Sequence, residues 1–435
     1  MKRIKRRAAA ALVLAGLIVI GMGFFLFRLA DQGGRWASYR ANAHVFNKNG
    51  TLISAAVTDR NGVALLHAAE GVYSYAEEES VRLGSLHAVG DRRGYVGGTA
   101  LSLFGKELTG WSLADGTPGG GTVVPLTLDS RLQSAAWQAL AGRPGAVMVL
   151  NYETGEILCM VSSPSYDPIR SPDMSVDGLF INRCTGGAFT PGSIFKLVTL
   201  VAAYENIPDL EDRTFFCDEV MTMGPDTVTC TGRHGEQTIE QALGNSCNIA
   251  FGELALELGG ETLRRTALRL GVAGSLPYHS AATAPGRFDT AESGTSLEAW
   301  SGIGQYNDLV TPYAMARLCA AIANGGVAAE PCLLLDGSCG RTRIMSGETA
   351  AYMDACMNYA AVTHYTWLFP DMDLGAKTGT AELGDGSAHA WFVGYLRSGA
   401  PLAFAVLVER GGNGYSVAGA IASAVLQNAL EYYEG

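Results

Sequence analysis

The chain has 435 residues, with 31 basic and 42 acidic side chains and a formal net charge of −11. This length allows two or three domains with a large buried core. The acidic balance argues against a nucleic-acid partner, because binding to phosphate backbones requires a basic surface. Lysine is scarce in the printed sequence, where six lysines stand among the 31 basic residues.

The N-terminus combines basic residues with a long apolar segment. Residues 1–7 read MKRIKRR, and residues 8–27 are uncharged and apolar. A helix over this segment would span about 30 Å, the thickness of a hydrocarbon core. We expect a cytoplasmic tail at 1–7 and an uncleaved single-pass anchor at 8–27, with the rest of the chain on the extracytoplasmic side. A cleaved signal peptide is the alternative, but no small-x-small cleavage site ends the apolar run.

Residues 28–122 are predicted to form a short β-rich pedestal, a dimerisation-like or contact module. Asn-Gly pairs at 49–50 and 61–62 are hairpin signals between the apolar runs 51–57 and 63–67. The Gly-rich segment 116–121 has no Gly-Lys-Ser/Thr of a phosphate loop, so we interpret it as a linker. This part of the chain shows no catalytic pattern.

Residues 123–435 are predicted to form a larger α/β (α+β) domain. Thr127 to Asp129 could cap a helix over 130–140, and an apolar helix follows at 418–433. Strands expected from both ends of this region suggest one five-stranded antiparallel sheet flanked by helices, with an inserted helical subdomain over about 192–359. The five strands are expected at 146–150, 156–161, 376–381, 389–397 and 402–409.

A serine and a lysine stand one helical turn apart at the start of that insertion. Pro191 and Gly192 precede Ser193, and the apolar positions that follow predict a buried helix with Ser193 in its first turn. Lys196 then lies on the same face. A lysine can take the proton of a serine hydroxyl if burial lowers the lysine pKa. A single Ser-x-x-Lys is more often an unremarkable surface pair, so other motifs must support it.

Two further motifs could complete a cleft. Ser246 and Asn248 are expected in a turn between helices, where Ser246 could relay a proton and Asn248 could hold Lys196 and a substrate amide. On a later strand, Lys377 and Thr378 offer a cation and a hydroxyl to a carboxylate. The next two residues of that strand are Gly379, beside which a substrate backbone can lie, and Thr380, whose N–H could hold an oxyanion.

The nine cysteines all follow the predicted anchor, and an odd number cannot all pair. Cys217 and Cys230 flank a short polar segment and could form a disulfide in an oxidising compartment. Cys230 with His234 could instead begin a metal site, but no second Cys-x-x-Cys or His pair completes it, so a zinc site is disfavoured. Most other cysteines have apolar neighbours and are expected to be small core residues.

The three motifs, in this order, resemble the signature of penicillin-binding proteins and serine β-lactamases. Further segments resemble class B penicillin-binding proteins, which are monofunctional peptidoglycan D,D-transpeptidases. Tyr306 departs from that pattern, because the family usually has a glycine after the Gly-Gln at 304–305. The other resembling segments are 145–150, 154–158, 162–168, 182–183, 311–312, 324–326 and 390–395.

The resemblance implies a mechanism. Ser193 would attack the penultimate D-Ala carbonyl of a D-Ala-D-Ala stem peptide, and Lys196 would take its proton. Ser246 would protonate the departing D-Ala, whose carboxylate Lys377 and Thr378 would bind. No metal or organic cofactor is implied, and penicillins would acylate the same serine. The enzyme would act at the outer face of the bacterial cell membrane and dock a polytopic glycan polymerase through residues 8–110.

Two other functions compete with this expectation. The first is a hydrolase, either a D,D-carboxypeptidase or a β-lactamase. No Glu-x-x-Leu-Asn follows Ser246-x-Asn248 to activate a hydrolytic water, which weighs against it. The second is a β-lactam sensor or scaffold, and the complete set of motifs weighs against that function.

Overall fold

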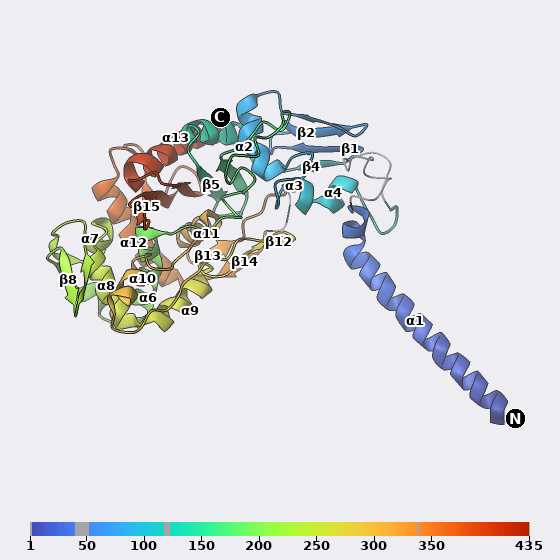
Figure 1. Cartoon of the computed structure of the whole chain (residues 1–435), viewed down its shortest axis with the longest axis horizontal. Coiled ribbons are helices and arrows are strands. Elements are labelled where there is room, and N and C mark those ends of the chain that lie inside the picture. The colour runs from blue at the N-terminus through green and yellow to red at the C-terminus, as the bar shows by residue number, and fades with distance from the viewer. Residues whose placement is uncertain (1, 40–51, 117–121, 336, 338, 435) are drawn as a thin grey trace.

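The structure is a computed structural model that describes residues 2–39, 52–116, 122–335, 337 and 339–434. It begins with one long helix, α1 (Lys2–Ala37), which extends away from the rest of the molecule (Figure 1). Its most apolar window has a mean hydropathy of 2.6, and none of that window is buried. Helix α1 is thus long and apolar enough to cross a membrane, and it includes the basic residues of the expected tail.

The β-rich unit after α1 contains a four-stranded sheet of order β3-β2-β1-β4. The predicted turn at 61–62 joins β1 and β2 as an antiparallel hairpin, with Gly62 at φ 83°. The predicted hairpin at 49–50 and most of the predicted linker, from 117 on, lie outside the described residues. The elements are β1 (Ser54–Thr58), β2 (Ala64–Ala69), β3 (Val72–Tyr75), α2 (Glu79–Val89), α3 (Ala100–Leu103), α4 (Gly105–Thr109) and β4 (Val123–Pro125).

Buried polar contacts fasten this unit to the larger domain. The Asp59 carboxylate is fully buried and accepts hydrogen bonds from the backbone N–H and the hydroxyl of Ser130, at 3.1 and 2.7 Å. Arg82 on α2 pairs with Asp167 at 2.9 Å. Helix α2 also packs on α5 (Ser130–Leu140), which begins where the sequence predicts and is capped by Asp129. The two units therefore share one core.

The larger domain is built on a five-stranded antiparallel sheet of order β15-β16-β17-β5-β6, as predicted. Its central strands are buried on both faces along nearly their whole length, which explains their nearly continuous apolar sequences. Helices α5 and α13 pack on one face, and α11 packs on the other. The elements are β5 (Gly145–Asn151), β6 (Ile157–Ser163), β15 (Leu374–Glu382), β16 (Ala388–Leu396), β17 (Leu402–Val408), a π-helical turn (Gly414–Gly419) and α13 (Ala420–Glu434).

The insertion between β6 and β15 is less purely helical than predicted, because four two-stranded sheets accompany its helices. Turn-rich polar segments between the helices allow these short hairpins. The helices are α6 (Lys196–Asn206), α7 (Ile239–Gly244), α8 (Asn248–Leu258), α9 (Gly260–Leu270), α10 (Ser296–Gly302), α11 (Pro312–Ala323) and α12 (Gly347–His364). The strands are β7 (Thr214–Cys217), β8 (Val220–Met223), β9 (Asp226–Thr229), β10 (Gly235–Thr238), β11 (Pro277–Tyr278), β12 (Ala281–Ala282), β13 (Val327–Ala329) and β14 (Arg341–Arg343).

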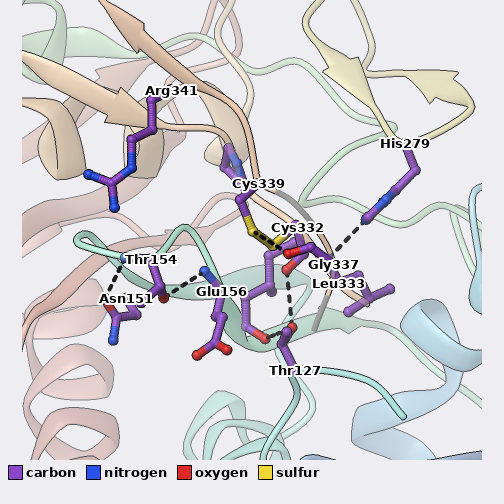
Figure 2. The surroundings of a disulfide bond; sticks show 12 residues. Thr127, Asn151, Thr154, Glu156, His279, Cys332, Leu333, Gly337, Cys339 and Arg341 are labelled. Atoms are coloured by element: carbon purple, nitrogen blue, oxygen red, sulfur yellow. Dashed lines mark hydrogen bonds between the residues drawn. A yellow bond between two sulfur atoms is a disulfide. The ribbon is translucent and has the colours of Figure 1, made fainter. Parts of the chain in front are cut away.

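A disulfide that no sequence pattern predicted joins Cys332 to Cys339 (Figure 2). The Cys332 carbonyl accepts hydrogen bonds from the Ile157 N–H at 2.9 Å and the Thr127 hydroxyl at 3.1 Å. The crosslinked segment thus lies against the start of β6. Cys217 and Cys230 are both free thiols.

Candidate active site

The nucleophile candidate lies in a tight turn before α6. Residues Gly192–Phe195 form a 3-10 turn, so Ser193 stands one turn before the α-helix and not within it. Gly192 has φ 55°, and a Cβ at this position would lie 2.8 Å from the carbonyl oxygen of Thr380. Glycine therefore permits both the left-handed backbone and the close approach of this turn to β15.

Lys196 is fully buried, and its amine contacts Ser193 and the turn that carries Ser246 and Asn248. Its Nζ lies 3.1 Å from Ser193 Oγ and 2.8 Å from Asn248 Oδ1. It also lies 2.5 Å from the carbonyl oxygen and 3.3 Å from the Oγ of Ser246. Burial lowers the pKa of Lys196 to about 7, although the nearby Cys247 and Cys230 act in the opposite direction. A large fraction of this amine is therefore neutral near neutral pH, as a proton acceptor must be.

The turn that carries Ser246 and Asn248 joins α7 to α8. Ser246 adopts φ 55°, and the Cys247 side chain caps α8 by accepting a hydrogen bond from the Ala250 N–H. The Asn248 Nδ2 donates to the Thr229 carbonyl at 2.8 Å, which orients its Oδ1 toward Lys196. The two residues that follow Ser246 in this turn are thereby held in place.

The third motif lies on β15, which is the edge strand of the sheet. Lys377 is fully buried, and its Nζ lies 3.0 Å from Ser246 Oγ. Burial, followed by repulsion from Lys196, lowers the pKa of Lys377 well below its usual value. Gly379 lies against the nucleophile turn, since a Cβ there would be 2.8 Å from the Pro191 carbonyl oxygen. Thr380 is exposed on the same strand.

Two tyrosines of this region are not assigned a site role from sequence. Tyr365 follows α12, and its hydroxyl lies 3.1 Å from Thr378 Oγ1 and accepts from the Thr378 N–H at 3.2 Å. No motif marks this contact, which only the packing of α12 on β15 creates. Tyr306 adopts φ 66°, a conformation in which the glycine usual in the resembling family is free of strain.

All eight sequence-predicted site residues therefore lie on three segments that meet at one place. This arrangement of a serine next to a buried amine, with a second buried lysine on an edge strand of the sheet, is typical of a serine acyltransferase. A family model described as the penicillin binding protein transpeptidase domain matches residues 145–427.

Known proteins support the same class. The chain is 30% identical over 383 residues to peptidoglycan D,D-transpeptidase PbpA of Mycolicibacterium smegmatis, which covers 77% of this chain and 76% of that protein. The D,D-transpeptidase domain of a peptidoglycan glycosyltransferase from Eggerthella lenta has a TM-score of 0.74 and 27% identity, over 87% of this chain and 98% of that one. Penicillin-binding protein A from M. tuberculosis, solved as a ceftriaxone acyl-enzyme complex, has a TM-score of 0.72 and 25% identity, over 87% and 98% of the two chains.

The chain therefore belongs to the penicillin-binding protein transpeptidase family, and its activity is that of a peptidoglycan D,D-transpeptidase. These findings confirm the sequence-based predictions of the family, the fold class and the reaction.

Proposed function

We propose that Ser193 is the nucleophile and Lys196 is its base. The observation that carries this assignment is the 3.1 Å contact between Ser193 Oγ and the buried Lys196 Nζ. In the first step, Ser193 Oγ attacks the carbonyl carbon of the penultimate D-Ala, and its proton moves to the neutral Lys196 amine. The N–H groups of Ser193 and Thr380 hold the negative charge that develops on the carbonyl oxygen.

The leaving group then receives a proton through Ser246. Ser246 Oγ lies near both lysine amines, so it can take the proton from Lys196 and pass it to the departing D-Ala nitrogen. Asn248 holds Lys196 and binds a substrate amide. The amine of a second stem peptide attacks the resulting ester, which forms the cross-link and restores Ser193.

Lys377 and Thr378 recognise the terminal carboxylate of the donor peptide. An incoming carboxylate favours the charged form of Lys377, whose pKa burial lowers in the free enzyme. The donor backbone lies along Gly379 at the edge of β15. In the described part of the chain this strand pairs only with β16, which leaves its outer edge available for a peptide.

Labelling with a fluorescent penicillin tests this assignment. The wild-type protein is expected to form a covalent adduct, as the relative from M. tuberculosis does with ceftriaxone. Ser193→Ala should abolish the adduct, whereas Ser398→Ala, on an exposed loop, should leave it unchanged. Intact-mass spectrometry of the wild-type protein also separates a lasting transpeptidase adduct from one that a β-lactamase would hydrolyse within seconds.

An outward-facing catalytic domain fits an enzyme that acts on the cell wall. We propose a cytoplasmic tail at 1–7, an anchor within α1 at 8–27, a pedestal at 28–122 and a transpeptidase domain at 123–435 that faces outward; its first strand, β4, completes the pedestal sheet. Basic residues at the start of α1 support this orientation. A cysteine introduced at Ser398 should react with a membrane-impermeant maleimide in intact cells. Protection of that cysteine would indicate the opposite orientation.

The pedestal is proposed to dock a polytopic glycan polymerase through residues 8–110. It holds none of the eight site residues, yet buried polar contacts attach it to the catalytic domain. Co-purification with such a polymerase should be lost when residues 8–110 are replaced and retained when Ser193 is mutated. Equal recovery from the replaced and native chains would contradict this role.

A further inference from the structure

Four potential metal ligands converge next to the Ser246–Asn248 turn. Cys217 ends β7, Cys230 directly follows β9, His234 directly precedes β10, and Cys247 caps α8. Their ligand atoms all lie within 4.8 Å of one another. Four separate segments of the insertion therefore bring three thiols and one imidazole to a single point.

The separations match a tetrahedral metal site. Zinc–sulfur bonds of about 2.3 Å with tetrahedral angles place two sulfur ligands about 3.8 Å apart. Cys230 Sγ lies 3.9 Å from Cys247 Sγ and 3.6 Å from His234 Nδ1. All three of these cysteines are free thiols, so none of them is used in a disulfide.

The surroundings also suit metal-bound thiolates. The Asn248 N–H donates to Cys230 Sγ at 3.2 Å, and the Ala250 N–H donates to Cys247 Sγ at 3.5 Å. Backbone donors of this kind orient sulfur ligands and stabilise their negative charge. Cys217 and Cys247 are buried, and Cys230 and His234 are partly exposed, so an ion can enter from one side.

We propose that Cys217, Cys230, His234 and Cys247 bind one structural Zn²⁺ ion, which holds the Ser246–Asn248 turn in its catalytic geometry. Three sulfurs and one imidazole complete a tetrahedral shell, and such closed sites are structural in zinc proteins. Thiolate ligands also select zinc over magnesium and calcium, which prefer oxygen.

The position of Cys247 couples this ion to the catalytic centre. Cys247 stands between Ser246 and Asn248, so a bond from its sulfur to the metal restrains both neighbours. Cys230 adds a second restraint, because it accepts from the Asn248 N–H. This positioning effect rests on the proposed roles of Ser246 and Asn248, whereas metal binding does not.

The sequence disfavours zinc because no second Cys-x-x-Cys or His pair accompanies Cys230 and His234. In the structure, two single residues from other segments, Cys217 and Cys247, join Cys230 and His234. The β7–β10 pairing and the β8–β9 hairpin bring Cys217 to Cys230, and the turn before α8 brings Cys247.

Metal analysis of the full-length protein, purified in detergent without chelators, tests the site itself. Inductively coupled plasma mass spectrometry should find one zinc per chain. Cys217→Ala and Cys230→Ala should lose the metal, whereas Cys356→Ala, at a buried cysteine on α12, should keep it. His234→Cys should also keep zinc, because sulfur can replace the imidazole, and His234→Ala should lose it. Co²⁺-exchanged wild-type protein should show thiolate-to-cobalt charge transfer, which tests the ligands without any variant.

Wild-type protein that lacks zinc and does not take up Zn²⁺ after thiol reduction would overturn the proposal. A Cys217–Cys230 disulfide in the native protein would also overturn it; it would appear as a second two-proton mass loss beside that of the Cys332–Cys339 bond, and peptide mapping would locate it. Zinc retained by both Cys217→Ala and Cys230→Ala would show that the metal is bound elsewhere.

The coupling is tested on the wild-type protein alone. Removing zinc with a chelator should slow acylation by fluorescent penicillin by at least about tenfold, and added Zn²⁺ should restore it. Equal acylation rates with and without zinc would overturn the positioning effect but leave the site. Zinc-loaded protein that penicillin never acylates would contradict the proposed function instead, so the two failures are distinguishable.

Discussion

The Nζ of Lys377 lies 3.0 Å from the Oγ of Ser246. This contact joins β15 to the turn before α8, across 131 residues of sequence. Lys196 Nζ lies 3.3 Å from the same hydroxyl. Ser246 therefore lies between the proposed base Lys196 and the cation proposed to bind the leaving group, so its hydroxyl is placed to relay a proton.

Lys196→Arg should slow acylation by penicillin by at least about 100-fold, because arginine keeps the charge but cannot accept the serine proton. Stopped-flow or gel-based acylation rates measure this effect. Lys106→Arg on α4 of the pedestal is the matched control and should acylate at the wild-type rate. A normal rate in Lys196→Arg would remove Lys196 from the role of base.

The acylation rate should rise with pH through about 7. In the proposed mechanism the neutral form of Lys196 is the reactive one, and burial lowers its pKa to about 7. Below that pKa, each pH unit should reduce the rate about tenfold, and above it the rate should level off. A profile of kcat/KM for acylation between pH 5 and 9 measures this. A rate that is flat from pH 5 to 7 would contradict a base of this pKa.

Lys377→Ala should weaken penicillin acylation about 10- to 100-fold, because a charge-assisted hydrogen bond to the carboxylate is worth about 1.5–3 kcal/mol. A penicillin methyl ester, which lacks the carboxylate charge, separates binding from catalysis. The wild-type and Lys377→Ala proteins should react with the ester at similar rates. An equal loss with both compounds would mean that Lys377 acts on the chemistry and not on carboxylate recognition.

Gly192→Ala should destabilise the fold by about 1–3 kcal/mol, because alanine is strained at φ 55° and its Cβ would meet the Thr380 carbonyl oxygen. Acylation should also fall, since the same turn carries Ser193. Thermal unfolding and labelling measure the two effects. Gly97→Ala is the control, because a Cβ there meets nothing within 4 Å and the residue lacks a positive φ.

Asp59→Ala should destabilise the junction between the pedestal and the catalytic domain. This fully buried carboxylate accepts hydrogen bonds from the Ser130 N–H and hydroxyl. Its loss leaves these buried donors unpaired, which should lower the free energy of unfolding by about 1–3 kcal/mol. Thermal unfolding of the full-length protein should show a lower Tm. Asp371→Ala, at an exposed loop position, should unfold like the wild type, and equal Tm values for both variants would contradict the prediction.

Much of the sheet is readable from the sequence because its strands are buried on both faces. A strand without a solvent face becomes a short continuous apolar run, such as Ala146–Leu150, and glycine and polar residues mark where it ends. The start of α5 at Ser130 was readable for a related reason, since Asp129 is a local cap. These signals depend on neighbours in sequence, so no tertiary information is needed.

The chain by itself also singled out Ser193, Lys196 and Lys377 as candidate site residues, because their spacing in three motifs is specific. It did not determine the short hairpins of the insertion, the Tyr365–Thr378 contact or the Cys332–Cys339 disulfide. Each of these depends on which distant segments pack together.

Lys196 shows most clearly what the sequence decides and what only the fold decides. The sequence places a lysine after Ser193, but only the fold removes Lys196 from water and so lowers its pKa toward neutrality. The cysteine cluster follows the same rule, since Cys217 and Cys247 meet Cys230 only after the insertion folds. Residue types set which chemistry is available, and burial and convergence decide where it operates, because desolvation and distance are properties of the folded chain.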